Sequence, residues 1–290
     1  MRWREREGVR WLEAELPGED AGNGGARAAF SARLGGVSEG PFESLNLGRL
    51  TGDLPDAVHE NRHRLAAAIG IDPELVLIGK QVHGVRVVRH HQPPEHPSYA
   101  NPTPGLPEAD GQATARRDLA ALVFVADCLP VALAGPGGIA MIHCGWRGLA
   151  AGIVERGVQE VEAHAAAVGP GIGPCCYEVG DEVLAAFEAL GPGVADGRML
   201  DLRRVARRLL ERAGVTSVEV SDECTSCQPE LFFSHRRDGK RTGRQAGLVW
   251  ASDEVAVQAG EPAAPSAPKP AGNVGEAEAS GGVIPEEPAE

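Results

Sequence analysis

Apolar residues along the first 250 positions recur with either the two-residue period of strands or the longer period of helices. Short apolar runs predict strands at residues 26–32, 75–78, 85–89, 119–125, 131–134, 139–143, 218–220 and 248–250. Amphipathic segments predict helices at residues 56–69, 149–166, 180–190 and 202–213, and Asp201 is the expected N-cap of the last one.

The order of these elements favours a mixed fold over a parallel, doubly wound sheet. Residues 119–134, with the Gly-Pro-Gly-Gly turn that follows at 135–138, predict consecutive antiparallel strands. Parallel strands would instead need a long crossover between them. We therefore expect an α+β protein with largely antiparallel sheets.

The periodic pattern stops after Trp250. Residues 252–290 are rich in Ala, Pro, Gly and Glu and contain almost no large apolar side chains. Such a segment cannot bury enough surface to offset the entropy lost on ordering. We predict a single catalytic domain over residues 1–251 and a disordered acidic tail over residues 252–290.

Charge and hydropathy narrow the range of partners. The tail, with eight acidic residues and one lysine, carries more than half of the net charge of −13, so the body is only mildly acidic. No lysine-rich stripe is present, which argues against nucleic acid or an anionic membrane as the partner. No apolar run reaches the length of a transmembrane helix, and the Met1-Arg-Trp-Arg start lacks the apolar core of a secretory signal. We expect a cytoplasmic protein that acts on a small molecule; its oligomeric state is not predicted.

Six cysteines are present, and a reducing cytosol favours free or metal-bound thiols over disulfides. Cys224 and Cys227 have the spacing of a redox pair or of half a zinc site. No second Cys-x-x-Cys completes such a site, so ordinary thiols are the favoured interpretation of this pair.

Three residues offer a ligand set that suits zinc: His83, Cys128 and His143. His143 ends an apolar strand, which is a rigid place to mount a ligand. Three protein ligands leave a coordination position free for water or substrate, which is the mark of a catalytic zinc rather than a structural one. The chain is therefore expected to be a metalloenzyme.

Residues next to these ligands suggest further chemistry. Arg147, between Gly145 and Gly148 at a predicted helix entry, suits a phosphate group, although the same segment also fits a tight turn with an exposed arginine. Asp127 is a candidate acceptor for a ligand imidazole or a general base, with a turn-capping role equally open.

Two glycine-rich segments fit the loops of a binding cleft. Their polar side chains are suited to ribose hydroxyls or phosphate, and solvated surface positions are the alternative for Arg33, Asn46, Arg237 and Arg244. The glycines at 169–173 lack the lysine and spacing of a phosphate-binding Walker loop, so nucleoside triphosphate binding finds no support.

The ordered motifs of the chain resemble the YfiH/PgeF family, also called the laccase-domain or multicopper polyphenol oxidase family. The resemblance spans about residues 30–250 and rests on Gly35-Gly-Val-Ser38, Ser44-Leu-Asn-Leu-Gly48, Asn61-Arg62, Gln81-Val-His-Gly84, Ala109-Asp110, Ala126-Asp-Cys-Leu-Pro130, His143-Cys-Gly-Trp-Arg-Gly148, Gly169-Pro-Gly-Ile-Gly173, Cys224-Thr225 and Arg236-Arg-Asp238. It implies a four-layer α/β/β/α sandwich and a zinc held by His83, Cys128 and His143. Cys144 and Gln245 depart from the family, which usually has alanine and methionine there.

The resemblance also implies a purine nucleoside phosphorylase, which converts adenosine, inosine, guanosine or methylthioadenosine plus phosphate to the base and ribose 1-phosphate. Adenosine deaminase activity and a link to peptidoglycan editing are associated with the family. We expect the metal to orient and activate phosphate while arginines offset its charge, with Asp127 and Arg147 as the catalytic candidates.

Three alternatives remain open. A copper polyphenol oxidase is disfavoured, because a multicopper centre needs dense histidine pairs and the nine histidines include no His-x-His. A Cys/His hydrolase acting on cell-wall fragments would use Cys128 as nucleophile and His83 or His143 as base. A non-catalytic nucleoside-binding protein would bind without turnover.

Overall fold

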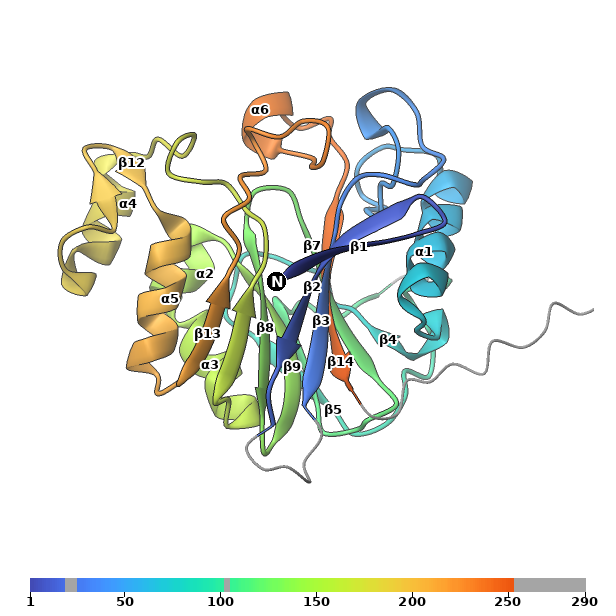
Figure 1. Cartoon of the computed structure of the whole chain (residues 1–290), viewed down its shortest axis with the longest axis horizontal. Coiled ribbons are helices and arrows are strands. Elements are labelled where there is room, and N and C mark those ends of the chain that lie inside the picture. Colours follow the sequence, from blue (N-terminus) through green and yellow to red (C-terminus); the bar gives the residue numbers. More distant parts are fainter. Residues whose placement is uncertain (19–24, 102–104, 253–290) are drawn as a thin grey trace, which may run out of the picture. The chain divides into compact units, whose positions relative to one another are not determined.

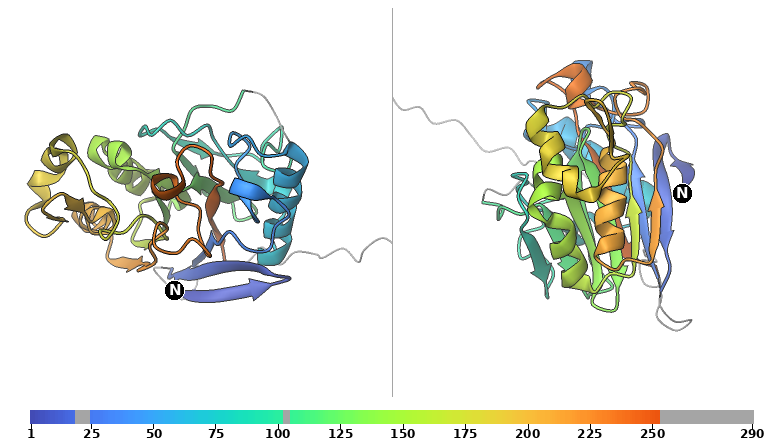
Figure 2. Two further views of the ribbon diagram at one scale, coloured as in Figure 1. Left: turned by 90° about the horizontal axis from the view of Figure 1, so that it is seen from above. Right: turned by 90° about the vertical axis from the view of Figure 1, so that its left-hand side faces the viewer.

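The computed structural model describes residues 1–18, 25–101 and 105–252, and all of them fall within one compact unit, Met1–Val257. Within this unit two six-stranded sheets pack face to face, and helices cover the outer face of each sheet (Figure 1). The view from above shows the same succession of layers (Figure 2, left). The predicted four-layer, mixed α and β architecture is confirmed.

The first sheet is antiparallel except at one edge, where its last pair is parallel. Its strands, in spatial order, are β1 (Arg2–Arg6), β2 (Val9–Leu16), β3 (Ala26–Ser31), β14 (Gln245–Ala251), β7 (Ala120–Val125) and β4 (Val76–Leu77). Helix α1 (Pro55–Ile69) covers its outer face through a cluster that includes Leu65, Leu122 and Leu248. Proline at the first helical position and left-handed Gly70 at the end fit the local preferences for starting and stopping a helix.

The second sheet pairs its strands antiparallel, except for β10 with β13 and β5 with β6. Its order is β13 (Ser217–Val220), β10 (Ala165–Val168), β8 (Leu129–Gly135), β9 (Gly138–Cys144), β6 (Gly111–Thr114) and β5 (Val87–His90). The outer layer comprises α2 (Trp146–Ala151), α3 (Ile153–Val161), α4 (Asp181–Phe187) and α5 (Leu202–Arg212). Asp201 caps α5 as expected, since its side chain accepts from the backbone N of Arg204 at 3.0 Å.

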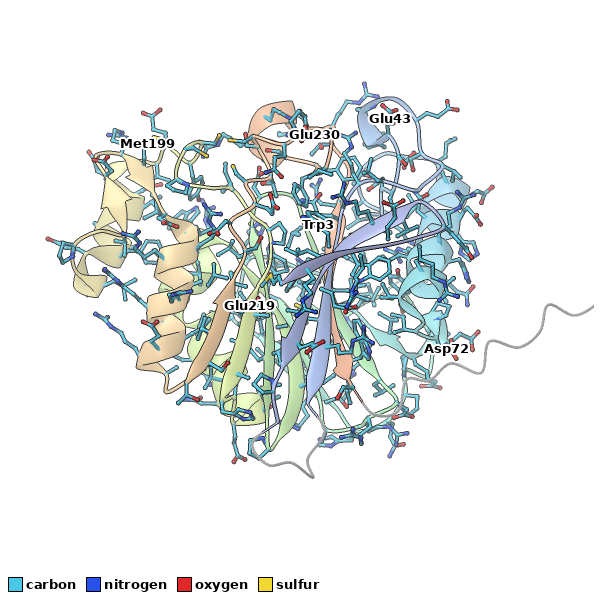
Figure 3. All side chains as sticks on the ribbon, viewed as in Figure 1. Trp3, Glu43, Asp72, Met199, Glu219 and Glu230 are labelled. Atoms are coloured by element: carbon cyan, nitrogen blue, oxygen red, sulfur yellow. The ribbon has the colours of Figure 1, made fainter. Side chains whose placement is uncertain are left out.

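Shorter elements complete the unit. They are the 3₁₀ turns Gly40–Phe42, Pro73–Leu75 and Glu188–Leu190, the β11 (Ala195–Asp196) and β12 (Met199–Leu200) pair, and α6 (His235–Asp238). Trp3 on β1 lies 6.2 Å, ring to ring, from Phe232 and so joins the edge of the first sheet to the loop before α6; Trp3 and Glu230 mark these segments in Figure 3. Among the described helices, none combines the length and apolar character needed to cross a bilayer.

Small and apolar side chains fill the space between the sheets. Phe30 and Val123 of the first sheet meet Ala132 and Met141 of the second in one buried cluster. A methyl group on Gly169 would stand 2.3 Å from Cδ1 of Phe30, so this close approach requires glycine. This buried cluster holds the two sheets together.

The prediction of consecutive antiparallel strands over 119–134 is wrong for its first pair. β8 and β9 form the expected hairpin, but β7 lies in the first sheet and β8 in the second. The chain crosses between sheets at residues 126–128, where Asp127 has a φ of 93°. Both strands are almost entirely buried, so no polar alternation along them indicates their partners.

The predicted helix over 149–166 is also shorter than expected. Left-handed Gly152 separates α2 from α3, and α3 ends at Val161. The alanines that extended the predicted helix begin β10, where they are buried between β8 and β13. Tertiary packing overrides the helical preference of alanine at this position. The tail predicted at 252–290 lies outside the described residues apart from Ser252.

Candidate metal site and its pocket

The three predicted metal ligands come together from three separate segments. His83 lies between β4 and β5, Cys128 at the crossing from β7 to β8, and His143 on β9. Their ligand atoms all lie within 4.8 Å of one another. Cys128 Sγ is 3.9 Å from His83 Nε2, and the two imidazole rings meet edge to face with centroids 4.9 Å apart. One thiolate and two imidazoles in this arrangement could hold a transition metal ion.

Asp110 is fully buried and accepts hydrogen bonds from both histidines. Its Oδ1 accepts from Nδ1 of His143 at 2.8 Å and from the backbone N of His83 at 2.9 Å. Its Oδ2 accepts from the backbone N of Val82 at 3.1 Å and of Gly84 at 2.7 Å. The bond to Nδ1 leaves Nε2 of His143 to face a metal, as in other carboxylate–histidine–metal arrangements.

Burial raises the pKa of Asp110, but hydrogen bonds from His143 and from the backbone outweigh it, and the net shift is downward. Asp110 was not predicted as a site residue. The available signal was the acidic residue placed immediately before β6, in the Ala109-Asp110 motif, but the sequence does not show that it faces His143.

The backbone around the ligands is shaped to leave room for an ion. His83 adopts a left-handed φ of 60°, held by the Asp110 carboxylate. A methyl group on Gly145 would lie 3.0 Å from Cys128 Sγ and 3.1 Å from His83 Cδ2. A side chain at 145 would therefore occupy the space between two ligands. The residues present fit a bound metal ion in both donor chemistry and space.

Electrostatics favour the ligand form of Cys128. Burial raises the pKa of its thiol, but His143 and His83 outweigh this and lower the pKa to about 6. Burial lowers the pKa of His143, while Cys128 and Asp110 raise it to about 9. The thiolate is the form of cysteine that binds a metal.

The candidate site opens into a pocket of about 790 Å³. Aromatic side chains in its lining are Phe124, Trp146 and Tyr177. Its cationic side chains are Arg49, Arg62, Lys80, Arg147, Arg236 and Arg244, whereas Asp127 supplies the one carboxylate among the described lining residues. Such a lining suits a ligand that combines a flat ring with an anionic group.

Arg147 and Arg244 lie in this lining. Arg147 is exposed, and its guanidinium stacks 4.4 Å from the Trp146 ring. Arg244 donates to the carbonyls of Thr242 and Gly243, and burial lowers the pKa of its guanidinium.

Asp127 also lines the pocket, but its carboxylate is engaged. Oδ1 accepts from Thr225 Oγ1 at 2.6 Å, and Oδ2 accepts from the backbone N of Arg236 at 2.6 Å. The residue that accepts a hydrogen bond from a candidate ligand imidazole is Asp110, which binds His143, and not Asp127. Asp127 ties the turn that carries Cys128 to the segments before and at the start of α6.

The other three residues predicted to contact the substrate are Arg33, Asn46 and Arg237, and none of them is in the described pocket lining. Arg33 donates to the carbonyls of Glu43 and Pro229. Asn46 is fully buried, where its Nδ2 donates to Asp53 at 2.9 Å and its Oδ1 accepts from the backbone N of Arg244 at 2.8 Å. Arg237 pairs with Asp238 and donates to the carbonyls of Thr225 and Phe232. Through these hydrogen bonds, all three side chains hold loops together.

Several lining residues escaped prediction. Gln81 is fixed in the wall because its amide donates to the carbonyl of Phe124 at 2.7 Å and accepts from its backbone N at 2.8 Å. Arg236 stacks 5.1 Å from the ring of Tyr177. Gln81 and Arg236 stand within motifs noted in the sequence, but neither motif shows which side chains face the pocket.

Comparison with known proteins identifies the family of the chain. A family profile described as multi-copper polyphenol oxidoreductase laccase matches residues 27–252. The chain is 39% identical over 239 residues to the purine nucleoside phosphorylase YfiH of Escherichia coli (strain K12), covering 78% of this chain and 94% of that protein. It is 41% identical over 235 residues to a protein of Deinococcus radiodurans named purine nucleoside phosphorylase, covering 76% and 87%.

Solved structures give the same result. The crystal structure of the Bacillus licheniformis hypothetical protein YfiH superposes with a TM-score of 0.74 at 30% identity, covering 86% of this chain and 99% of that one. YlmD from Geobacillus stearothermophilus superposes with a TM-score of 0.72 at 30% identity, covering 86% and 98%. Because the family profile, the relatives and the fold agree, the chain belongs to the YfiH family of laccase-like, multi-copper polyphenol oxidoreductase domains.

Proposed function

We propose that the protein is a zinc-dependent purine nucleoside phosphorylase, which converts a purine nucleoside and phosphate to the free base and ribose 1-phosphate. The observation that carries the proposal is the three-ligand cluster of His83, Cys128 and His143 on the wall of a cation-rich, aromatic pocket. The names of relatives at about 39% identity over most of the chain support the same reaction.

Zinc is the proposed metal because of the donors. The cluster offers one thiolate and two imidazoles, and the other described group able to hold a metal contains only cysteines. A multicopper centre would need several copper ions held by many histidines. The two described groups together contain only two histidines, His83 and His143. Zinc suits such a mixed set and keeps a fourth position free when bound by three protein ligands. When bound, the ion would supply Lewis-acid activation of an oxygen ligand.

The cationic lining has a proposed role in binding phosphate. Arg147 and Arg244 lie with Cys128 in one pocket, and Arg236 extends the positive wall beside Tyr177. Guanidinium groups bind phosphate oxygens through charge-assisted, often bidentate hydrogen bonds. We assign phosphate to this arginine-rich side.

The aromatic lining has a proposed role in binding the base. Trp146 and Phe124 belong to the pocket lining, and aromatic rings of this kind can stack on a purine base. We assign Asp127 a positioning role, since both of its oxygens accept hydrogen bonds that hold the Cys128 turn. Arg33, Asn46 and Arg237 are proposed to act on substrate binding only by holding the loops around the pocket.

Product identification tests the proposal. The purified full-length protein is incubated with adenosine, with and without phosphate, and the products are separated. We expect adenine and ribose 1-phosphate, formed only when phosphate is present. Inosine would indicate deamination at the same site, and adenine with free ribose would indicate hydrolysis. Absence of any nucleoside turnover by the zinc-loaded protein would contradict the proposed function.

A further inference from the structure

Four cysteines converge beside the pocket, apart from the His/Cys cluster. Cys175 and Cys176 lie in the loop that follows β10, and Cys224 and Cys227 in the loop that follows β13. Their four Sγ atoms lie within 4.8 Å of one another. Cys227 Sγ is 3.3 Å from both Cys175 Sγ and Cys176 Sγ. The cysteines that accompany Cys224 and Cys227 are therefore Cys175 and Cys176. These two are adjacent in sequence, so they lack the Cys-x-x-Cys spacing by which a second pair could be recognised.

We propose that these four thiols bind a second metal ion, a structural Zn²⁺ held by Cys175, Cys176, Cys224 and Cys227. Four thiolates complete a tetrahedral zinc shell and leave no position for substrate, in contrast to the three-ligand site. Zinc–sulfur bonds of about 2.3 Å place tetrahedral sulfurs about 3.8 Å apart. The observed separations, from 3.3 Å to no more than 4.8 Å, bracket that value, so only small side-chain movements are needed.

The backbone already holds the two loops in the required register. Cys224 forms an isolated parallel bridge with Gly171, and the backbone N of Thr225 donates to the carbonyl of Gly171 at 3.1 Å. The backbone N of Gly173 donates to Cys224 Sγ at 3.1 Å, a type of bond that orients a metal-ligating thiolate. A methyl group on Gly173 would stand 3.3 Å from Cys175 Sγ. The backbone thus brings the four thiols together without requiring the ion.

A metal at this place would brace the wall of the main pocket. Tyr177, directly after Cys176, lines that pocket, as does Ile172 at the start of the same loop. On the other loop Thr225, next to Cys224, donates to Asp127 beside the ligand Cys128. The second ion shares no ligand with the first, and its role is to position these residues.

A disulfide is the competing use of the same sulfurs. Cys227 stands equally near Cys175 and Cys176, but 3.3 Å is well beyond a disulfide bond of about 2.05 Å. A disulfide would also use only two of the four thiols. Simultaneous convergence of all four favours a metal.

Metal content and thiol protection of the full-length protein test the proposal. After growth with zinc, we expect two zinc ions per wild-type chain, one in Cys227→Ser and one in Cys128→Ala. Cys144→Ala is the matched control, since Cys144 is a buried cysteine outside both clusters, and it should keep two. Cobalt replacement separates the sites, because thiolate-to-cobalt absorption should fall mostly in Cys227→Ser and only slightly in Cys128→Ala.

The wild-type protein alone decides the case if Cys227→Ser does not fold. Alkylation followed by mass spectrometry should find all four cysteines protected with zinc and modified after a chelator removes it. One zinc per wild-type chain with the four thiols freely alkylated would overturn the proposal. A bond between Cys227 and Cys175 or Cys176 in the zinc-grown protein would overturn it as well.

Discussion

Asp110 accepts a hydrogen bond from Nδ1 of His143 at 2.8 Å with the same oxygen that accepts from the backbone N of His83 at 2.9 Å. One buried carboxylate thus orients both histidines. It binds the ring of His143 and the backbone of His83. The geometry of the candidate metal site therefore depends on a residue that is not one of the three candidate ligands.

Replacing Asp110 with asparagine is expected to weaken metal binding at the His/Cys site by about 10- to 100-fold. The amide would set an N–H donor against groups that themselves donate, so the orientation of His143 would be lost. Competition with a chromogenic chelator measures the affinity. Asp118→Asn is the control, because Asp118 is exposed and pairs with Arg116 at the surface. Equal affinities in the two variants would contradict the role of Asp110.

Gly145→Ala tests the space between the ligands. Its new methyl group would lie 3.0 Å from Cys128 Sγ, so the ligands must move apart and zinc affinity should fall with little change in helix content. Gly180→Ala is matched to it, because Gly180 is also a helix N-cap in extended conformation but a methyl group there has no neighbour nearer than 3.8 Å. Chelator titration and circular dichroism of both proteins make the comparison. Unchanged zinc affinity in Gly145→Ala would show that the clearance is unimportant.

Arg147→Ala is expected to raise the KM for phosphate by roughly 10- to 100-fold, the effect of losing a hydrogen bond to a charged group worth about 1.5–3 kcal/mol. Bound zinc should stay unchanged, because Arg147 is exposed and stacks on Trp146 without contacting the ligands. Steady-state kinetics at varied phosphate provide the measurement, with Arg116→Ala as the control, because Arg116 is a partly exposed arginine outside the lining of this pocket. If KM is the same in both variants, phosphate binds elsewhere, and Arg244 and Arg236 become the next positions to test.

Truncation locates the end of the folded domain. Ala251 is the last residue of β14 and pairs with Ala26, and the backbone N of Ser252 donates to the carbonyl of Gly25. Ending the chain after Ser252 should leave the melting temperature and activity unchanged, since the composition beyond it cannot supply a core. Ending it after Trp250 should lower the melting temperature. Thermal melts of the full-length protein and the two truncated proteins provide the measurement. A large fall in melting temperature for the chain that ends after Ser252 would contradict the prediction.

The hydrophobic pattern predicted most of the central strands and the mixed sheet architecture, because buried strands and amphipathic helices leave different periods in sequence. It could not place β7 and β8 in separate sheets, since both are buried on both faces. It missed β1 and β2, where charged side chains interrupt the apolar run. It also extended a helix through the alanines of β10.

The grouping of His83, Cys128 and His143 was predictable, because one cysteine and two histidines are a donor set that indicates a metal site. The role of Asp110 was not, since its partners lie 27 and 33 positions away. Arginines and asparagine in glycine-rich loops do not reveal where they point: Arg244 faces the pocket, whereas Asn46 is buried beneath it and bonds to the backbone of Arg244. Side-chain direction in loops is set by the fold as a whole.

Ribose 1-phosphate release, measured while the His/Cys site is emptied and refilled, shows directly whether a zinc ion at this site is catalytic. Wild-type protein is stripped of metal, assayed with adenosine and phosphate, reloaded with zinc or copper, and assayed again beside Cys128→Ala treated identically. We predict that zinc restores the wild-type rate, that copper does not, and that Cys128→Ala stays inactive while folded. Full phosphorolysis by the stripped protein or by Cys128→Ala would contradict a catalytic zinc at His83, Cys128 and His143.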